Sequence, residues 1–301
     1  MAPIPISVFT GFLGAGKTTT ILNLLPLLPT DYKVVLLKNE FGDVEVDSKL
    51  AQQSSLTAVS EILNGCMCCV LVGQMQTALL EIRDNFHPDR IIIECSGSAF
   101  PATLAFQIRQ LAQDTGDFVL DAIITVVDAE NFTGYEDDSP TARMQASYSD
   151  IILINKWEHV SERDLDIVID HLCTLNDETP KIKCQPRLDP ALIFGLSSKL
   201  FLTHDPQFDH VHDEVETLTV AIVAVSRNIL TDALLLLPRD AIWRVKGFVL
   251  LADEGRHILN WAFGRYELTV YDGGAEGLTV MGRRGDVRSS SAKFVSALSQ
   301  R

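Results

Sequence analysis

The chain has 301 residues, and 47% of them are hydrophobic, which is enough material for two domains with buried cores. Its formal net charge of −15 argues against a nucleic-acid partner, because phosphate backbones are bound through clustered Lys and Arg side chains. No apolar stretch approaches the roughly 20 residues of a membrane span, and the N-terminus lacks the basic and apolar regions of a signal peptide. We therefore expect a soluble, cytoplasmic protein that binds neither nucleic acid nor membranes.

The first motif along the chain is a phosphate-binding loop. Residues 11–18 match GxxxxGK[ST], between an apolar run at 4–9 with strand character and a helical pattern at 18–28. Glycines let backbone N–H groups converge on phosphate oxygens, and the helix start adds its positive dipole end. Lys17 is expected to reach the β- and γ-phosphates, and Thr18 to bind Mg²⁺. The predicted nucleotide-binding residues of this loop are Gly11, Gly14, Ala15, Gly16, Lys17, Thr18 and Thr19.

Four further apolar runs alternate with helix-length segments. They lie at 34–37, 90–93, 122–127 and 151–154, and they predict an α/β fold with a mostly parallel sheet and helices on both faces. Polar residues follow these runs, namely Asn39-Glu40, Glu94, Asp128 and Asn155-Lys156. Ligands bind at the carboxyl ends of parallel strands, so we expect these motifs to converge on one crevice.

Two of these motifs predict further parts of a nucleotide site. Glu94 ends an apolar strand, the pattern of the second P-loop strand that holds Mg²⁺ or its water, and Gly97 could place a backbone N–H near the γ-phosphate. Asn155-Lys156-Trp157-Glu158 resembles the NKxD loop of GTPases, in which a carboxylate accepts from guanine and rejects adenine. Glu158 stands where Asp is usual and is one methylene longer. We predict catalytic roles for Lys17, Thr18 and Glu94, and base recognition by Asn155, Lys156 and Glu158.

Three of the six cysteines lie within four residues, at Cys66, Cys68 and Cys69. Thiolates suit Zn²⁺ or Cu(I), and three of them leave a fourth ligand position to water, a carboxylate or another side chain. Two alternatives stay open, a redox pair of Cys66 and Cys69 and a set of small buried hydrophobic side chains. Cys95, Cys173 and Cys184 are expected to be packing residues.

The composition changes at residues 203–217. This stretch holds His204, His210 and His212 among five acidic residues and no Lys or Arg, and it is typical of a solvated linker, with metal capture as the alternative. Beyond it we predict strands at 218–225, 243–251, 261–271 and 278–281, and helices at 229–237 and from about 290. The predicted organisation is a P-loop domain at 1–202, the linker at 203–217 and an α+β domain at 218–301.

Together these motifs resemble the CobW family of P-loop GTPases, which are metallochaperones and metal-insertion proteins. The resemblance covers nearly the whole chain. It includes the phosphate loop, the segment Asn39-Glu40-Phe41-Gly42, the stretch from Glu61 to Cys69 with its GCxCC element, and the turn Glu94-Cys95-Ser96-Gly97. In the second domain, residues 243–247 and 262–268 look like the C-terminal module of that family.

The resemblance implies a two-state mechanism with GTP or GDP, Mg²⁺ and Zn²⁺ as ligands. Cys66, Cys68 and Cys69 would carry the metal between two switch regions, and Glu40, Asp43 and, more weakly, Asp47 could respond to Mg²⁺ or to the carried metal. The γ-phosphate and Mg²⁺ would order the switches and assemble the thiolate site, which hydrolysis would loosen. No arginine finger is evident, so we expect slow intrinsic turnover, on the order of 10⁻⁴–10⁻² s⁻¹.

The implied partner is a client metalloprotein. Zinc-transferring relatives carry a Cys-Pro-Glu-Leu-type docking motif for methionine aminopeptidase, of which only Pro3-Ile4-Pro5-Ile6 is present. That partner therefore stays without support in the sequence. A GTPase assisting cobalt insertion in cobalamin synthesis, and a nucleotide-responsive metal or thiol sensor, are the alternative functions.

Overall fold

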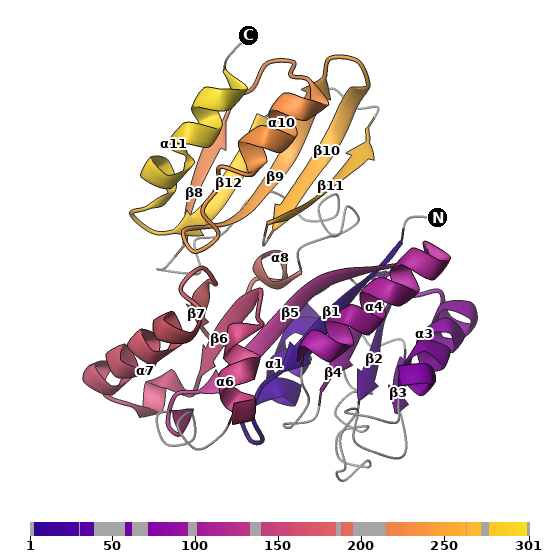
Figure 1. Cartoon of the computed structure of the whole chain (residues 1–301), viewed down its shortest axis with the longest axis vertical. Coiled ribbons are helices and arrows are strands. Elements are labelled where there is room, and N and C mark those ends of the chain that lie inside the picture. The colour runs from indigo at the N-terminus through magenta and orange to yellow at the C-terminus, as the bar shows by residue number, and fades with distance from the viewer. Residues whose placement is uncertain are drawn as a thin grey trace. The chain divides into compact units, whose positions relative to one another are not determined.

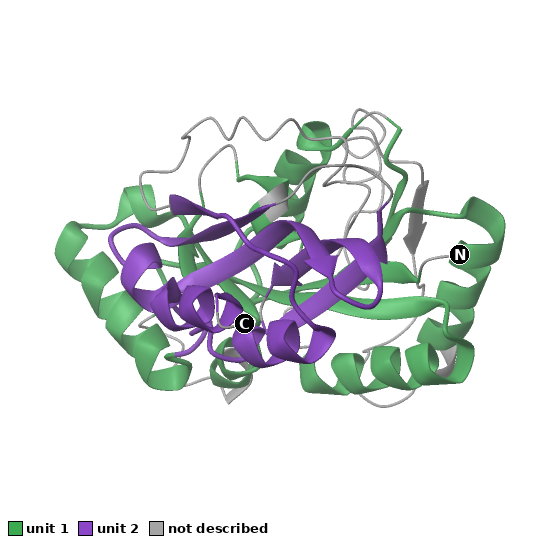
Figure 2. Ribbon diagram, turned by 90° about the horizontal axis from the view of Figure 1, so that it is seen from above, with its two compact units in different colours: residues 1–177, 181–194 green, residues 178–180, 195–301 purple. Residues whose placement is uncertain are grey.

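The computed structural model describes residues 3–29, 31–38, 58–61, 72–95, 101–132, 140–184, 188–194, 215–262, 264–271 and 277–299. The chain divides into two compact units (Figure 2). One comprises residues 1–177 and 181–194, and the other residues 178–180 and 195–301.

The first unit is built on a seven-stranded sheet with the order β3-β2-β4-β1-β5-β6-β7, in which every neighbouring pair is parallel. Its strands are β1 (Ile4–Thr10), β2 (Val34–Lys38), β3 (Ala58–Glu61), β4 (Arg90–Glu94), β5 (Phe118–Asp128), β6 (Ile151–Asn155) and β7 (Lys181–Lys183). The strands β2 and β4 are buried along their whole length, which explains the continuous apolar runs at 34–37 and 91–93 within them.

Helices cover both faces of this sheet. They are α1 (Lys17–Leu24), α3 (Val72–Phe86), α4 (Pro101–Thr115), α6 (Pro140–Ser147), α7 (Glu162–Leu175) and α8 (Pro190–Ile193), with the 3-10 turns η1 (Leu25–Leu27) and η2 (Trp157–His159). Alternate residues of β1 show the division. Helices α3 and α4 lie on one face (Figure 1), and Ile6 and Val8 share a core with their apolar side chains. Ser7 faces the other way, where the buried Arg90 forms an ion pair with Asp121.

That second face also contacts the end of α8. The Arg90 guanidinium lies 4.4 Å from the ring centroid of Phe194, and both the Arg90 and Asp121 side chains are fully buried. The predicted P-loop-type parallel sheet with helices on both faces is therefore confirmed. The first helix is shorter than expected, because it gives way to η1 at Leu25, where Pro26 has no N–H to continue an α-helix.

The second unit is a five-stranded antiparallel sheet with the order β11-β10-β9-β12-β8. Its elements are β8 (Val215–Val220), α10 (Arg227–Leu234), β9 (Ile242–Leu251), β10 (Gly255–Ala262), β11 (Arg265–Val270), β12 (Gly277–Arg283) and α11 (Val287–Leu298). Both helices pack on one face of the sheet (Figure 1), and their apolar side chains share one core with Val245, Leu259 and Val280. The smaller α+β domain is confirmed.

Three predictions for this unit were wrong in detail. The single strand expected at 261–271 is in fact the end of β10 and the whole of β11, separated at Gly264, whose φ of +76° suits a reversal of the chain. The strand expected at 218–225 begins at Val215, inside the range expected as linker, and ends at Val220. Helix α10 begins at Arg227, because the Ser226 side chain accepts a hydrogen bond from the Ile229 N–H.

None of the helices in the described part of the chain is both long and apolar enough to span a bilayer.

Candidate nucleotide site

The phosphate loop joins the end of β1 to the start of α1. Gly11, Gly14 and Gly16 have φ values of +134°, +80° and +95°, which L-residues with side chains rarely adopt. A Cβ at Gly11 would lie 2.1 Å from the Val126 carbonyl oxygen, and one at Gly16 would lie 2.3 Å from the Asn155 amide nitrogen. Two of the motif's glycines are thus required by close contacts as well as by backbone conformation.

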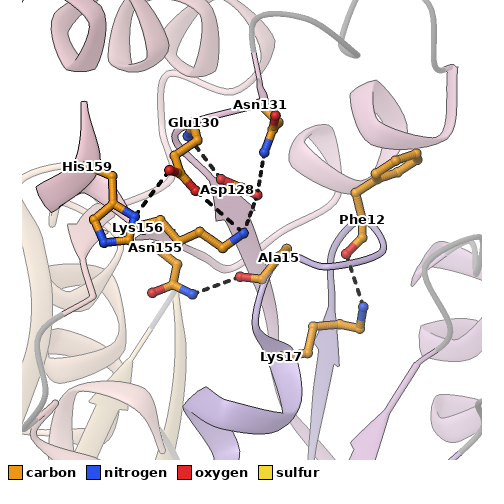
Figure 3. Close-up of polar contacts among 9 residues, drawn as sticks. All are labelled: Phe12, Ala15, Lys17, Asp128, Glu130, Asn131, Asn155, Lys156 and His159. Carbon is orange, nitrogen blue, oxygen red and sulfur yellow. Dashed lines mark hydrogen bonds and ion pairs between the residues drawn. The ribbon is translucent and has the colours of Figure 1, made fainter. Parts of the chain in front are cut away.

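Lys17 lies inside this loop. Its side chain is buried, and its ammonium donates a hydrogen bond to the Gly11 carbonyl oxygen at 3.0 Å. It donates a second one to the Phe12 carbonyl oxygen at 3.2 Å (Figure 3). These contacts hold a positive charge at the N-terminal end of α1, where the helix dipole also favours an anion. The geometry fits a phosphate-binding loop.

Thr18 and Glu94 meet at the first turn of α1. The Thr18 hydroxyl donates a hydrogen bond to one carboxylate oxygen of Glu94, which is fully buried at the end of β4. On its other side, the second carboxylate oxygen of Glu94 lies 3.8 Å from the Lys38 ammonium at the end of β2. A hydroxyl and a carboxylate side by side are hard oxygen donors, so these two residues fit Mg²⁺.

The predicted base-recognition loop begins at the end of β6. The Asn155 side-chain amide donates to the Ala15 carbonyl oxygen at 2.9 Å, which ties this loop directly to the phosphate loop (Figure 3). The Trp157 indole N–H donates to the Cys184 carbonyl oxygen at 2.8 Å, and Glu158 is exposed on η2. The motifs at 11–18 and 155–158 therefore converge, as the sequence predicted.

Lys156 has a left-handed backbone, with φ of 59° and ψ of 20°. This conformation costs a residue with a side chain roughly 1–2 kcal/mol, so the surrounding contacts must hold it. The Lys156 ammonium donates to the Asp128 carboxylate at 2.6 Å and lies 3.8 Å from the Glu130 carboxylate (Figure 3). Its carbonyl oxygen accepts from the His159 N–H at 3.1 Å.

Asp128 ends β5 and is almost fully buried. It accepts hydrogen bonds from the Glu130 backbone N–H at 3.0 Å, the Asn131 side chain at 2.9 Å and the Lys156 ammonium. Burial by itself raises the pKa of this carboxyl group, but the three hydrogen bonds outweigh it and hold the pKa below its usual range. Asp128 is therefore ionised at neutral pH.

Comparison with known proteins agrees with this geometry. A family profile described as CobW/HypB/UreG, nucleotide-binding domain, matches residues 5–183, more than half of the chain. The chain belongs to the CobW/HypB/UreG family. The family resemblance found in the sequence is thereby confirmed, and the first unit is a nucleotide-binding domain of this family.

Full-length relatives extend the similarity of this CobW/HypB/UreG protein over both units. It is 28% identical over 279 residues to the zinc chaperone YjiA of Escherichia coli strain K12, covering 86% of each chain. It is 29% identical over 316 residues to the zinc chaperone CobW of a Sinorhizobium species, covering 89% of this chain and 88% of the relative. The crystal structure of a Zn(II)-bound triple mutant of the YjiA GTPase aligns over the whole of both chains with a TM-score of 0.50 and 22% identity, which shows a shared fold.

The remaining predicted site residues of this CobW/HypB/UreG protein are less completely placed. Thr19 lies exposed in the first turn of α1. The others lie outside the described residues, namely Glu40, Asp43, Asp47, Cys66, Cys68, Cys69, Gly97, His204, His210 and His212. Within the ranges that the structure describes, no three His, Cys, Asp or Glu side chains lie close enough together to hold a metal ion.

The three isolated cysteines behave differently from one another. Cys95 and Cys184 are buried, and burial raises the pKa of their thiols to about 12 and about 11. They are packing residues, as predicted. Cys173 is exposed, so the same prediction was wrong for it. It follows Leu172 on α7, where Leu165, Val168 and Leu172 form the buried stripe and the next residue points away from the core.

Sequence reasoning missed Lys38 and assigned no contact to Asp128. Lys38 ends β2 and reaches Glu94, and Asp128 ends β5 and reaches Lys156. Asp128 was expected at the crevice but was given no role. A charged residue at the carboxyl end of an otherwise buried apolar strand was the available signal for both.

Proposed function

We propose that this protein is a GTP-hydrolysing metallochaperone that binds Zn²⁺ at Cys66, Cys68 and Cys69 and transfers it to a client metalloprotein under control of the nucleotide state. The observation that most supports nucleotide hydrolysis is the contact between the Thr18 hydroxyl and the buried Glu94 carboxylate. This contact joins the phosphate loop to the end of β4, the strand that supplies the Mg²⁺-binding carboxylate in P-loop hydrolases. The relatives named zinc chaperones, which match both units of the chain, support the choice of cargo.

The nucleotide is bound by two loops that the Asn155–Ala15 hydrogen bond holds together. The backbone N–H groups of the glycine loop and the start of α1 bind the phosphates, and Lys17 exchanges its carbonyl contacts for the β- and γ-phosphates. Glu158 accepts from the guanine N1–H and 2-amino group, a donor pair that adenine lacks. Gly97 senses the γ-phosphate.

Thr18 and Glu94 are the residues that would hold Mg²⁺, because their hydroxyl and carboxylate oxygens lie side by side. When bound, Mg²⁺ neutralises charge that develops on the phosphate oxygens. The Lys38 ammonium lies 3.8 Å from the second Glu94 carboxylate oxygen and places a positive charge beside this buried acid. No described arginine is assigned to the transition state, so intrinsic turnover stays slow.

The position of Lys38 in the sequence suggests how the nucleotide site is coupled to the metal cargo. Lys38 directly precedes Asn39-Glu40, the first switch segment of the family resemblance, and its ammonium contacts the same carboxylate that Thr18 contacts. A change at the Mg²⁺ site therefore reaches Lys38, the residue directly before that segment. We infer that the GTP form assembles the three thiolates and that the GDP form binds zinc more weakly.

The test is a competitive Zn²⁺ titration of reduced protein without nucleotide, with Mg-GDP and with a Mg-GTP analogue. A shift of tenfold or more, about 1.4 kcal/mol of coupling, is expected between the GTP and GDP forms. Cys66→Ser should weaken zinc binding and leave nucleotide binding in place, and Lys17→Ala should remove the shift. Equal zinc affinities in the three states would contradict the proposal. Repeating the titration with Co²⁺ distinguishes zinc from cobalt as cargo.

A further inference from the structure

The turn after β5, residues 128–131, contacts the base-recognition loop at two separate side chains. Asp128 accepts from the Lys156 ammonium at 2.6 Å, and one carboxylate oxygen of Glu130 lies 3.2 Å from the His159 ring nitrogen (Figure 3). The backbone adds a third link, since the Ala129 N–H donates to the Asn155 carbonyl oxygen at 2.9 Å. The sheet aligns the two segments, because Asp128 and Asn155 are register partners of β5 and β6.

Asp128 is itself held in place. One of its carboxylate oxygens accepts from the Glu130 N–H, and the other accepts from both Asn131 and Lys156. With both oxygens engaged by protein donors, Asp128 is not arranged as a metal ligand or a proton acceptor. Its side chain is 6% exposed, whereas that of Lys156 is 31% exposed, so a nearly buried anion fixes a partly exposed cation.

Lys156, the residue that Asp128 holds, has an unusual backbone conformation. His87 and Lys156 are the only residues other than glycine with positive φ in the described ranges. Lys156 also stands between Asn155, which bonds to the phosphate loop, and η2, which carries Glu158. A relaxation of the Lys156 backbone would therefore move Asn155 and Glu158 relative to each other. A strained backbone that contacts hold on several sides is the kind of pre-organisation found in ligand sites.

We propose that Asp128 is a positioning residue for guanine recognition, which holds Lys156 in its left-handed conformation and so fixes the distance between the phosphate loop and the base-recognition loop before nucleotide binds. This inference rests on the proposed function. It assigns the end of β5 a role in base selectivity and not in phosphate chemistry.

The experiment measures Mg-GDP and Mg-ADP binding by calorimetry for wild type, Asp128→Ala and Asp128→Asn. Asp128→Ala should weaken Mg-GDP binding about tenfold and Mg-ADP binding much less, because only guanine depends on the placement of Glu158. Asp128→Asn keeps the size and one acceptor oxygen and should fall in between. In steady-state hydrolysis, Asp128→Ala should raise the KM for GTP by a larger factor than it lowers kcat.

A double-mutant cycle with Lys156→Met assigns the effect to the pair. If Asp128 acts through Lys156, adding Asp128→Ala to Lys156→Met should change Mg-GDP affinity less than twofold. Asp117→Asn is the matched control, since Asp117 pairs with Arg83 in the same unit and should leave the GDP-to-ADP ratio as in wild type. Thermal melting of every variant confirms folding.

The outcomes separate this inference from the proposed function. If wild type binds Mg-GDP no better than Mg-ADP, the proposed GTP specificity fails, and with it the basis of this inference. If wild type prefers Mg-GDP and folded Asp128→Ala keeps the same preference, the positioning role is wrong and the proposed function stands. Equal losses for both nucleotides would show a general structural effect and also overturn the positioning role.

Discussion

The Asn155 amide nitrogen lies 2.9 Å from the Ala15 carbonyl oxygen, and this hydrogen bond links two loops that are 140 residues apart in sequence. Replacing Asn155 by Ala removes the link together with a predicted base contact. We expect nucleotide affinity to fall about tenfold or more, as measured by titration with a fluorescent GDP analogue.

The control for this change is Asn176→Ala, because the Asn176 amide also donates to a backbone carbonyl oxygen, that of Ala146, but after α7. It should leave GDP affinity at the wild-type value. A loss of equal size in both variants would mean that the effect of Asn155→Ala is not specific to the nucleotide site.

Gly16→Ala should lower both nucleotide affinity and stability. Its Cβ would lie 2.3 Å from the Asn155 amide nitrogen, in addition to the strain of a φ of +95°. Gly116→Ala is the matched control, because Gly116 has a φ of +73° with open space around the added Cβ, and it should cost only about 1–2 kcal/mol of strain. Urea unfolding measures the stability of both variants, and titration with the fluorescent GDP analogue measures their nucleotide affinity.

The clash between the added Cβ and Asn155 can also be tested by removing the Asn155 side chain. Asn155 is the only neighbour within 4 Å of that added Cβ among the contacts the structure describes, so Gly16→Ala combined with Asn155→Ala should be more stable than Gly16→Ala alone. A double variant that is no more stable than the single one would show that strain, and not the contact with Asn155, dominates at this position.

Glu94→Gln should impair the Mg²⁺-dependent step. Gln keeps the shape of the side chain but loses the charge that faces both Thr18 and Lys38. We expect a fall of roughly 10–100-fold in Mg²⁺ affinity or in the rate of GTP hydrolysis, measured as phosphate release across a Mg²⁺ titration. Glu254→Gln, which alters an exposed pair with Arg227, should have no effect on that titration. Full hydrolysis by Glu94→Gln at the wild-type Mg²⁺ requirement would contradict the assignment.

The buried pair of Arg90 and Asp121 should matter for stability and not for nucleotide binding. Arg90→Met leaves the Asp121 carboxylate buried opposite an apolar side chain, which typically costs about 3–5 kcal/mol of unfolding free energy. Arg83→Met removes a surface pair with Asp117 and should hardly move the unfolding midpoint. An Arg90→Met variant as stable as Arg83→Met would show that water or repacking compensates the lost charge.

The thiols should differ in reactivity with pH. Because the thiolate is the reactive form, the raised pKa values of Cys95 and Cys184 keep these thiols protonated and unreactive until the pH approaches about 12 and about 11. Iodoacetamide labelling of folded protein at pH 8, read by peptide mass spectrometry, should modify the exposed Cys173 and spare the other two. Labelling of Cys95 in the folded state would contradict its burial. The same treatment in urea should label all three.

The sequence alone determined the features that depend on residues close together along the chain. The phosphate loop could be predicted because its glycines and its Lys-Thr pair stand at fixed spacing between a strand pattern and a helix pattern. The convergence of residues 11–18, Glu94 and Asn155 on one edge could be predicted because parallel strands place their carboxyl ends together. Only the tertiary structure decided which polar side chains would pair there.

The contacts of Lys38 with Glu94, and of Asp128 with Lys156, join residues at the ends of strands that are neighbours in the sheet but distant in sequence. Which residues stand opposite one another is fixed by register, and strands buried on both faces lack the alternating hydrophobic pattern that would signal register in the sequence. The same reason explains Arg90, which begins a run read as apolar and proves to hold a buried ion pair with Asp121. Spacing along the chain made the motifs predictable, whereas strand pairing across the sheet decided which charged side chains pair to hold those motifs in place.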